Sequence, residues 1–407
     1  MTMNPSDTER GKAWLGNFEE DEQVAARLLL DGLDLIGADR LREDLFRGIE
    51  ALAAILPSPI ALVPVRAVDG NQSYHPLHSR DSRPQLLPST SFPGSEALIG
   101  NLAASLRRGA ENDGPFVAAP SLRNMRAARC RTVLFVDDFS GSGDRVLAFD
   151  RAFRRHPTIR SWLSRKWIDV HVVLFAATLD ATYRLGRHFG RDHVHVHRMC
   201  PTFGDRPWTG AERQAVEKLC RDHYVPTGKA GAYGYGNSRG MMAFVHSVPN
   251  NLPPILWQAG RRLGDGWRSF FLNQAVPSDL FSLFGDASPE QRAEQTFMRL
   301  GQRRLAAGSW RAVAGAETTR VLLVLSALSR RPVSIARVMG LTGLAHSEVQ
   351  TILHACRAWG LAGTTLRLTD AGRKELAHAK GIPLRDEIAP LHGSDEPYYP
   401  RYLRVGR

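Results

Sequence analysis

Residues 132–146 read TVLFVDDFSGSGDRV, and this stretch predicts the fold of the central part of the chain. Four apolar residues follow one another without polar alternation, which is typical of a strand buried on both faces of a parallel sheet. Two carboxylates, Asp137 and Asp138, end the apolar run, and a serine–glycine loop follows. Parallel sheets bind ligands just beyond the carboxyl ends of their strands, so the sequence places two candidate binding groups there.

The loop after the two aspartates has the composition of a phosphate site. Gly141 and Gly143 permit a tight turn that presents backbone N–H groups, and Ser140 and Ser142 add hydroxyl donors. The apolar periodicity that follows predicts a helix whose positive end faces the loop. A phosphate cradle beside two carboxylates favours a ligand with a terminal phosphate and vicinal hydroxyls, such as a ribose 5-phosphate, together with Mg²⁺.

The stretch resembles the PRPP-binding motif of phosphoribosyltransferases, in which a buried strand precedes two acidic residues and a Thr/Ser/Gly loop. The resemblance implies a catalytic pair, Asp137 and Asp138, that contacts the ribose hydroxyls and, indirectly, Mg²⁺. It implies that the ribose and its phosphate are held by Phe139, Ser140, Gly141, Ser142, Gly143, Asp144 and Arg145. Gly141 and Arg145 stand where the family motif commonly has threonine. The alternative is that the VDD sequence only ends a strand, as in receiver and hydrolase domains.

The composition predicts a soluble, cytoplasmic protein of two or three domains. The chain has 407 residues, and no apolar run approaches the ~20 residues of a membrane span. The four cysteines are far apart and form no CxxC motif, so neither disulfides nor a zinc knuckle is indicated.

The charge is distributed unevenly around a net of +12. Residues 1–56 carry 6 basic and 12 acidic side chains, a net of −6, whereas residues 318–380 carry 9 basic and 3 acidic side chains, a net of +6. The two regions could dock on each other, or the basic region could meet nucleic acid. A diffuse basic surface without a specific partner is the third interpretation.

Periodicity divides the first part of the chain into a helical segment over residues 1–56 and an α/β domain over residues 57–260. An apolar strand is expected at Ile60–Ala67. Arg66 lies near its end and is a candidate for pyrophosphate binding by comparison with phosphoribosyltransferases; the alternative is a surface arginine. Residues 68–94 predict a long loop that could cover a site.

Strand and helix patterns alternate after the phosphate loop, which predicts a parallel sheet. Strands are expected at Asp169–Ala176 and His193–Met199, with a helix at Leu179–Phe189 between them. His193, His195 and His197 would share one face of the second strand. They suggest either a metal site or an edge strand with one wet face.

A glycine-rich segment at residues 228–240 precedes an expected strand at Met241–His246 and the sequence PNNLPPILW. The amides of Asn250 and Asn251 could read a base edge or a sugar, and Tyr235 or Trp257 could stack on a base. The alternative is a structural turn closed by a core tryptophan.

Together, the N-terminal Trp/Phe helix, the VDDFSGSG loop and the PNN segment resemble the phosphoribosyltransferase-like proteins of prokaryotic conflict systems. The likeness covers about residues 14–260. It implies an α/β fold with a mostly parallel twisted sheet of the type I phosphoribosyltransferase kind. It also implies a role in anti-phage defence, with a partner such as a retron reverse transcriptase.

The remaining sequence predicts a helical connector over residues 261–316, a winged helix-turn-helix over residues 317–380 and a tail over residues 381–407. Ser334 should cap the second helix, Gly340 should end it, and Thr364–Leu368 should form a wing strand. The domain would contact nucleic acid or, alternatively, dock on a protein. The candidate phosphate-gripping residues are Arg330, Arg331, Arg337, Arg357, Arg367 and Arg373.

The sequence therefore predicts a defence protein that binds PRPP or a nucleotide and transfers or cleaves its glycosyl bond. Two alternatives remain open at this point. One is a non-enzymatic regulator that senses PRPP or a nucleotide and binds DNA, and the other is a scaffold in a defence complex.

Overall fold

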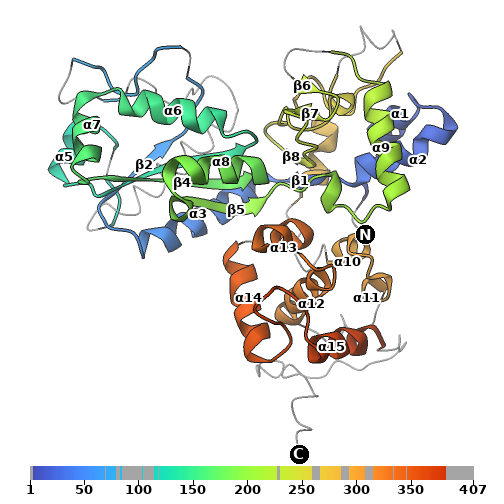
Figure 1. The fold of residues 1–407 in the computed structure, drawn as a ribbon. Helices are drawn as coiled ribbons and strands as arrows, with labels where there is room; N and C mark the ends of the chain where they lie inside the picture. Colours follow the sequence, from blue (N-terminus) through green and yellow to red (C-terminus); the bar gives the residue numbers. More distant parts are fainter. Residues whose placement is uncertain are drawn as a thin grey trace, which may run out of the picture. The chain divides into compact units, whose positions relative to one another are not determined.

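A computed structural model describes residues 3–68, 70–78, 83–84, 103, 114–117, 119–226, 230–258, 266–285, 293–307, 315–332, 334–344 and 346–381. The chain forms two compact units (Figure 1). One contains Met1–Thr202 and Gly210–Asp286, and the other contains Phe203–Thr209 and Ala287–Arg407. Most of the predicted loop over residues 68–94 and all of the tail from residue 382 lie outside the described residues. No helix in the described ranges is both long and apolar enough to traverse a bilayer.

A four-stranded parallel sheet forms the centre of the first unit. Its strands are β2 (Ile60–Pro64), β3 (Thr132–Ser140), β4 (Asp169–Ala177) and β5 (Val194–Met199), in the order β2-β3-β4-β5. All nine residues of β3 are buried, which confirms the interpretation of the unbroken apolar run. The strands predicted at residues 60–67, 169–176 and 193–199 are present, but β2 already ends at Pro64 and β5 begins at Val194, because His193 belongs to η2 (Arg191–His193). β5 lies at the edge of the sheet.

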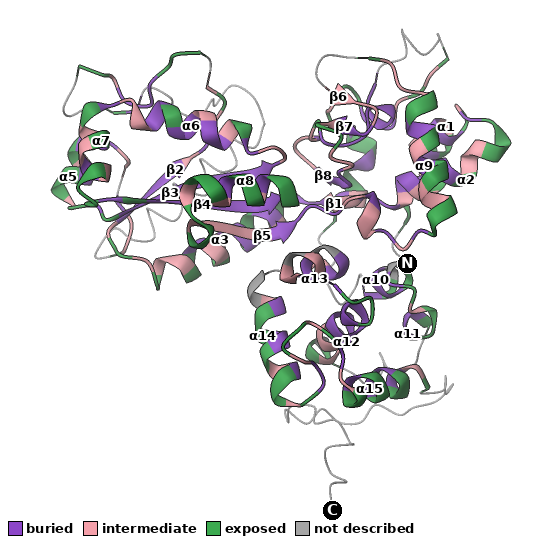
Figure 2. Cartoon of the chain, in the orientation of Figure 1, coloured by how far each residue is buried: buried purple, intermediate pink, exposed green. Residues whose placement is uncertain are grey.

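Four helices share one apolar core with the sheet, namely α5 (Leu122–Ala127), α6 (Asp144–Arg154), α7 (Pro157–Ser164) and α8 (Leu179–Phe189). Phe149 and Phe153 of α6 pack edge-on against Phe135 of β3, with ring centroids 5.2 and 5.3 Å apart. Figure 2 shows the strands buried and the outer sides of these helices exposed. The apolar stripe of α6 therefore fixes the position of its N-terminus at the end of β3.

A second core contains α3 (Ala38–Ala53) together with a small parallel ladder of β1 (Asp34–Ile36) and β8 (Met242–Phe244). Phe244 contacts Phe139 and Phe175 of the main sheet, with centroids 5.9 and 5.8 Å apart. The expectation of a purely helical segment over residues 1–56 was incomplete, because it missed β1. A strand of three residues shows no periodicity, and its pairing partner lies some two hundred residues later in the chain.

This unit also contains η1 (Pro5–Asp7), α1 (Glu9–Leu15), α2 (Glu20–Asp31) and α9 (Gly210–Asp222). Trp14 is fully buried, and its indole N–H donates to the carbonyl of Ile255 at 3.1 Å. The N-terminal helices are thus packed against the segment that contains the PNN sequence. Short elements complete the unit: η2 (Arg191–His193), β6 (Ala230–Gly231), β7 (Gly234–Tyr235), η4 (Pro254–Leu256) and η6 (Ser278–Phe284).

The second unit contains η3 (Phe203–Asp205) and the helices α10 (Ala293–Arg299), α11 (Arg303–Ala307), α12 (Ala316–Leu328), α13 (Ile335–Thr342), α14 (His346–Ala358) and α15 (Asp370–Gly381). Ser334 caps α13 as expected, since its side chain accepts from the N–H of Arg337. The predicted end of this helix at Gly340 was wrong. The helix continues to Thr342, and Gly343 ends it in the left-handed conformation with φ 69°.

The wing is smaller than the alternating pattern at Thr364–Leu368 indicated. It consists of one antiparallel bridge between Ala362 and Leu368, and Leu366 between them has a φ of 55°. Residues 364–367, which were predicted to belong to the wing strand, instead form the turn between Ala362 and Leu368. The three-helix core and the reduced wing nevertheless form the winged helix-turn-helix that the sequence predicted.

Candidate site at the carboxyl end of strand β3

Asp137 and Asp138 lie within β3, close to its carboxyl end, and are 1% and 3% exposed. The strand continues through Ser140, so the connection to α6 consists of Gly141, Ser142 and Gly143. Gly143 has a φ of 80°, a conformation that glycine adopts without strain. The predicted loop and the two acids therefore lie at one end of the sheet, as expected.

Two basic side chains enclose the acids. Arg145 Nη2 donates to Asp137 Oδ1 at 2.8 Å and to Asp138 Oδ1 at 3.1 Å. On the other side, His246 Nε2 lies 2.8 Å from Asp138 Oδ2. Neither carboxylate faces solvent in this arrangement, which differs from an open acid pair facing a sugar diol. Asp137 Oδ2 is also buried, without a hydrogen-bond partner among the described residues.

The two neighbouring carboxyl groups differ in their proton affinity. Burial raises the pKa of Asp137 well above its usual range, and the opposing charge of Arg145 does not cancel this effect. Burial acts in the same direction on Asp138, but the hydrogen bond from His246 and the charge of Arg145 outweigh it and lower the pKa of Asp138 to about 2. The two environments therefore shift the pKa values of adjacent carboxyl groups in opposite directions.

His246 was not predicted as a functional residue, although it ends the expected strand at Met241–His246. Its Nδ1 atom is buried without a hydrogen-bond partner in the described part of the chain, and its side chain is 10% exposed. In the sequence, His246 is a single histidine shortly before the PNN segment. No local pattern around it indicates that it pairs with Asp138. The pairing depends on the ladder of β1 and β8, which holds residue 244 against the sheet.

The loop of Gly141–Gly143 is fixed by α8 and its cap. Thr178 Oγ1 donates to the carbonyl of Gly141 at 2.5 Å, and Arg184 Nη1 donates to the carbonyl of Ser142 at 3.0 Å. Arg184 also pairs with Asp144 at 2.7 Å. The carbonyl groups are thus occupied, whereas no described residue accepts from the loop's three backbone N–H groups. Free N–H groups at a helix N-terminus form a concentration of positive charge that suits an anion.

Asn251 lies directly against the loop. A Cβ atom added at Gly141 would overlap the Asn251 side-chain amide. Asn251 Nδ2 donates to Ser238 Oγ at 2.9 Å, and the Asn251 carbonyl accepts from the N–H of Gly240 at 3.0 Å. A Cβ at Gly234 would overlap that carbonyl. The glycine-rich segment therefore lets the backbone pack closely around Asn251, and Gly141 in turn leaves room for its amide.

The other residues predicted for a base or sugar have different surroundings. Tyr235 donates its hydroxyl to Asp144 Oδ2 at 3.3 Å and so lies beside the loop. Asn250 is exposed, and its carbonyl accepts from the N–H of Tyr235 at 2.8 Å. Trp257 is 8% exposed, and its indole N–H donates to the carbonyl of Leu252 at 3.3 Å. Tyr235 and Asn251 therefore lie beside the loop of Gly141–Gly143. Trp257 instead packs inside the turn that begins at Leu252.

The model of the PRTase-CE family matches residues 12–272, well over half of the chain. This chain belongs to the PRTase-CE family. A second family model, described as wHTH-PRTase associated, matches residues 322–405. No curated protein and no solved structure matches the chain. The resemblance expected from the VDDFSGSG and PNN sequences, with a C-terminal winged helix-turn-helix, is confirmed.

Arg66 follows β2 in the PRTase-CE domain. The parallel register pairs Pro64 with Val136, and the N–H of Val65 donates to the carbonyl of Val136 at 2.9 Å. Continuing this register places Arg66 level with Asp138, at the same end of the sheet as the loop. Its candidate role in pyrophosphate binding stays a prediction.

The PRTase-CE carboxylate pair does not fit a magnesium ion bound directly between its oxygens. Mg²⁺ requires near-octahedral oxygen ligands and keeps several waters. Arg145 Nη2 already lies within hydrogen-bond distance of both carboxyl groups, and His246 takes the outer oxygen of Asp138. The guanidinium of Arg145 therefore already occupies the space between the two carboxyl groups.

The arginines predicted to contact nucleic acid are mostly exposed. Arg330, Arg331, Arg357, Arg367 and Arg373 all have exposed side chains. Arg337 is only half exposed, and it forms an ion pair with Asp205 and donates to the carbonyl of Gly204 at 2.6 Å. Arg337 thereby links α13 to η3 within the second unit. Arg373 is also paired, with Asp370.

Proposed function

We propose that the PRTase-CE domain binds PRPP or a nucleotide, with the terminal phosphate on the loop of Gly141–Gly143. The free backbone N–H groups of this loop, at the N-terminus of α6, are the observation that supports the proposal most directly. A phosphate accepts several such hydrogen bonds and is stabilised by the helix dipole. The side chains of Asn251 and Tyr235 border the same loop.

Arg145 provides the connection between the phosphate and the acids. Its Nη2 holds both carboxyl groups, while its Nε and Nη1 donate to no described residue, and its side chain is 36% exposed. A doubly charged phosphate competes with the carboxylates for this guanidinium. In the proposed complex the phosphate draws Arg145 away and opens Asp137 and Asp138 to the ribose hydroxyls.

Transfer or cleavage of the glycosyl bond is the first candidate for the step after binding. Such reactions pass through a positively charged sugar, which the ionised Asp138 would stabilise electrostatically. His246, held in position by Asp138, is placed to carry a proton to or from the reacting groups. The sequence alone offered no such proton carrier.

Ligand sensing without chemistry is the second candidate, and the burial of both acids favours it. If Arg145 stays on the carboxylates in the complex, the ligand occupies the loop and the diol never reaches them. The attached winged helix-turn-helix would then report ligand binding to nucleic acid or to a partner.

Calorimetry on the full chain tests the binding proposal. PRPP, ribose 5-phosphate and AMP should bind, and ribose should not. Gly141→Ala should abolish binding, because the added Cβ displaces Asn251 from the loop. Gly48→Ala is the matched control, since its Cβ meets no atom within 4 Å and it lies in the helix α3. Absence of binding to all three phosphates, or equal binding by Gly141→Ala, contradicts the proposal.

Product analysis separates the two candidates. His246→Gln should remove release of pyrophosphate or free base while leaving the affinity for PRPP within a few fold. Binding by the unmodified chain without any product, over hours and with a panel of bases, favours sensing.

We further propose a role in anti-phage defence, with a partner such as a reverse transcriptase, on the resemblance to conflict-system proteins. The test is the efficiency of phage plating on cells that carry the chain with its neighbouring genes. Gly141→Ala should restore plating, and Gly48→Ala should not. Equal protection by both variants would show that the loop of Gly141–Gly143 is not needed for defence.

A further inference from the structure

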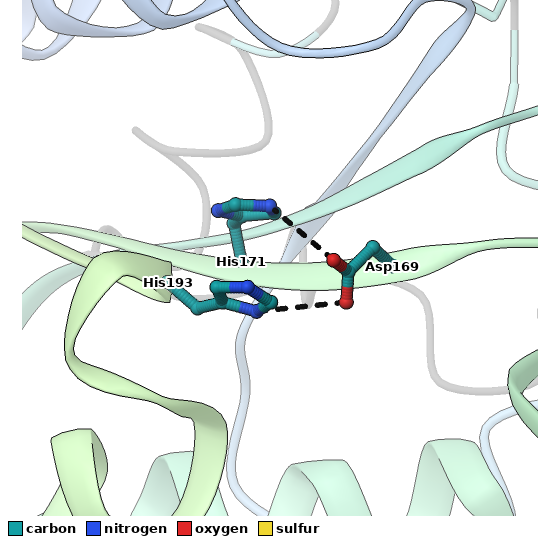
Figure 3. A group of neighbouring side chains, drawn as sticks. All are labelled: Asp169, His171 and His193. Carbon is teal, nitrogen blue, oxygen red and sulfur yellow. Dashed lines mark ion pairs between the residues drawn. The ribbon is translucent and has the colours of Figure 1, made fainter. Parts of the chain in front are cut away.

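Three side chains of the types that bind metals lie together at the amino-terminal end of the sheet, away from the phosphate loop. Asp169 begins β4, His171 is two residues further along that strand, and His193 ends η2 just before β5 (Figure 3). Asp169 pairs with Thr132 in the register, whereas the loop follows the pair Ser140–Ala177. Eight residue steps along the strand, from Thr132 to Ser140, separate the two sites by about 25 Å at the rise of a parallel strand.

The potential ligand atoms of these three residues converge. One ligand atom from each lies within 4.8 Å of the others. Asp169 Oδ2 is 4.0 Å from His171 Nε2, and Asp169 Oδ1 is 3.5 Å from His193 Nδ1. The first distance is too long for a hydrogen bond, and the second is at its limit. Figure 3 marks both contacts between the carboxylate and the two rings. Tetrahedral bonds of about 2.0–2.2 Å place ligand atoms about 3.4 Å apart, so the contact at 3.5 Å already fits, the one at 4.0 Å has to close by about 0.6 Å, and any pair at the 4.8 Å limit by about 1.4 Å.

A neighbouring histidine orients His171 in the way that a metal ligand requires. His171 Nδ1 lies 3.1 Å from His195 Nε2, so these two nitrogens share one hydrogen bond. If Nδ1 of His171 carries the proton, its Nε2 presents a lone pair toward Asp169. Ligating imidazoles usually donate their second nitrogen to such a partner, which fixes the ring and its tautomer. The His171 ring is further held by stacking on His193, with centroids 4.2 Å apart.

His193 has to give up one contact to bind a metal. Its Nδ1 lies 3.2 Å from the carbonyl of Val170, to which it can only donate. Metal binding moves that proton to Nε2, so the ring stays neutral and one hydrogen bond is exchanged for a coordinate bond. The His193 side chain is 29% exposed, which leaves an entry path for the ion and for a solvent ligand.

We propose that Asp169, His171 and His193 bind one divalent transition-metal ion of the zinc type, with His195 as the partner that orients His171. Two imidazoles and a carboxylate are donors that Zn²⁺ accepts, and hard cations such as Mg²⁺ prefer oxygen alone. The metal would join the start of β4 to η2 and so fix the entry into β5. This site is independent of the phosphate loop.

Titration of the untagged, chelator-treated full chain with Zn²⁺ and with Co²⁺ tests the proposal. One equivalent of Zn²⁺ should bind and raise the midpoint of thermal unfolding, and Co²⁺ should give the visible absorption of a four- or five-coordinate ion. Asp169→Asn and His193→Gln should each weaken Zn²⁺ binding at least tenfold. Both side chains are partly or largely exposed, at 60% and 29%, so these variants should fold.

His188→Gln is the matched control, because His188 pairs with Asp150 on the helical side of the sheet. It should bind Zn²⁺ like the unmodified chain. Asp138→Asn should also keep Zn²⁺ binding, which separates this site from the acid pair. The proposal is overturned if Zn²⁺ does not bind at 100-fold excess, or if binding survives unchanged in both Asp169→Asn and His193→Gln.

Discussion

At the scale of single residues, the acid pair shows that position in the sequence does not determine the behaviour of a side chain. Asp137 and Asp138 are adjacent and equally buried, yet their pKa values move in opposite directions. The difference arises because His246 reaches only Asp138. Sequence reasoning identified both acids from the VDD pattern. It could not assign their protonation, because the deciding imidazole comes from a distant segment.

The two acids should therefore respond oppositely to neutralisation. At pH 7 Asp137→Asn should raise the free energy of unfolding, since the carboxyl group with the raised pKa is costly to bury. Asp138→Asn should lower it by about 3 kcal/mol, because it leaves Arg145 and His246 without their ionised partner. Thermal unfolding of both variants measures this, and destabilisation of equal size in the two would contradict the assignment.

The pH dependence has a definite sign for each acid. Asp137 binds its proton more tightly in the folded chain, so stability falls as the pH rises above 3.8 through its raised pKa, and the benefit of Asp137→Asn grows over that range. Asp138 has a depressed pKa of about 2, so its contribution is present above pH 3.8 and is lost as the pH falls toward 2. Unfolding midpoints between pH 3 and pH 8 test both statements.

At the scale of elements, the long apolar runs were predictable and the short paired pieces were not. β3 and β4 could be identified because strands buried on both faces need continuous apolar residues. β1 and β8 have three residues each, and their existence depends on each other. The contact of His197 could not be predicted either, because it depends on a helix from a distant part of the sequence. His197 shares β5 with His195, yet it turns to Asp44 of α3 at 3.1 Å and takes no part in the histidine group.

Asp44 of α3 forms ion pairs with two residues of β5. It lies 3.1 Å from His197 and 3.6 Å from Arg198, and Arg40 and Arg47 of its own helix lie within 3.7 Å. Although burial acts to raise it, His197, Arg198 and Arg47 lower the pKa of Asp44 below its usual value. Asp44→Asn should destabilise the chain by about 3 kcal/mol at pH 7, because it removes the buried carboxylate that Arg198 faces at 3.6 Å and His197 at 3.1 Å.

Glu43→Gln on the same helix is the control for this prediction. The Glu43 side chain is 61% exposed and should contribute within about 0.5 kcal/mol. The destabilisation by Asp44→Asn should shrink as the pH falls below 3.8, since the depressed pKa makes the Asp44 contribution disappear in acid. A constant difference between the two variants from pH 7 to pH 3 would show that packing, and not charge, is responsible.

At the scale of the whole molecule, the chain combines a PRTase-CE domain with a winged helix-turn-helix that carries exposed arginines. The order of these parts followed from periodicity and from two short motifs. The sequence did not reveal that residues 203–209 belong to the second unit, because Arg337 reaches back to Asp205 only in the folded chain. An ion pair between residues so far apart leaves no local pattern in the sequence from which it could be predicted.

We propose that the exposed arginines bind the phosphates of a nucleic acid. Arg357→Gln and Arg367→Gln in the full chain should each weaken binding to duplex DNA and reduce the slope of log K against log salt by about one. Arg337→Gln should leave the slope unchanged, because its guanidinium is already paired with Asp205. Binding that shows no dependence on salt, or no loss in the first two variants, would instead favour a protein partner for this domain.

The contact between Asp138 and His246 spans 108 positions of the chain, and this has a consequence for synthesis on the ribosome. The acidic strand leaves the exit tunnel long before its imidazole partner has been translated. During that interval Arg145, only a few residues away, is the available counter-charge for both carboxyl groups. A nascent chain, or a product that ends before residue 246, would thus carry the serine–glycine loop without this imidazole, so synthesis beyond residue 246 determines when the Asp138–His246 pair can form.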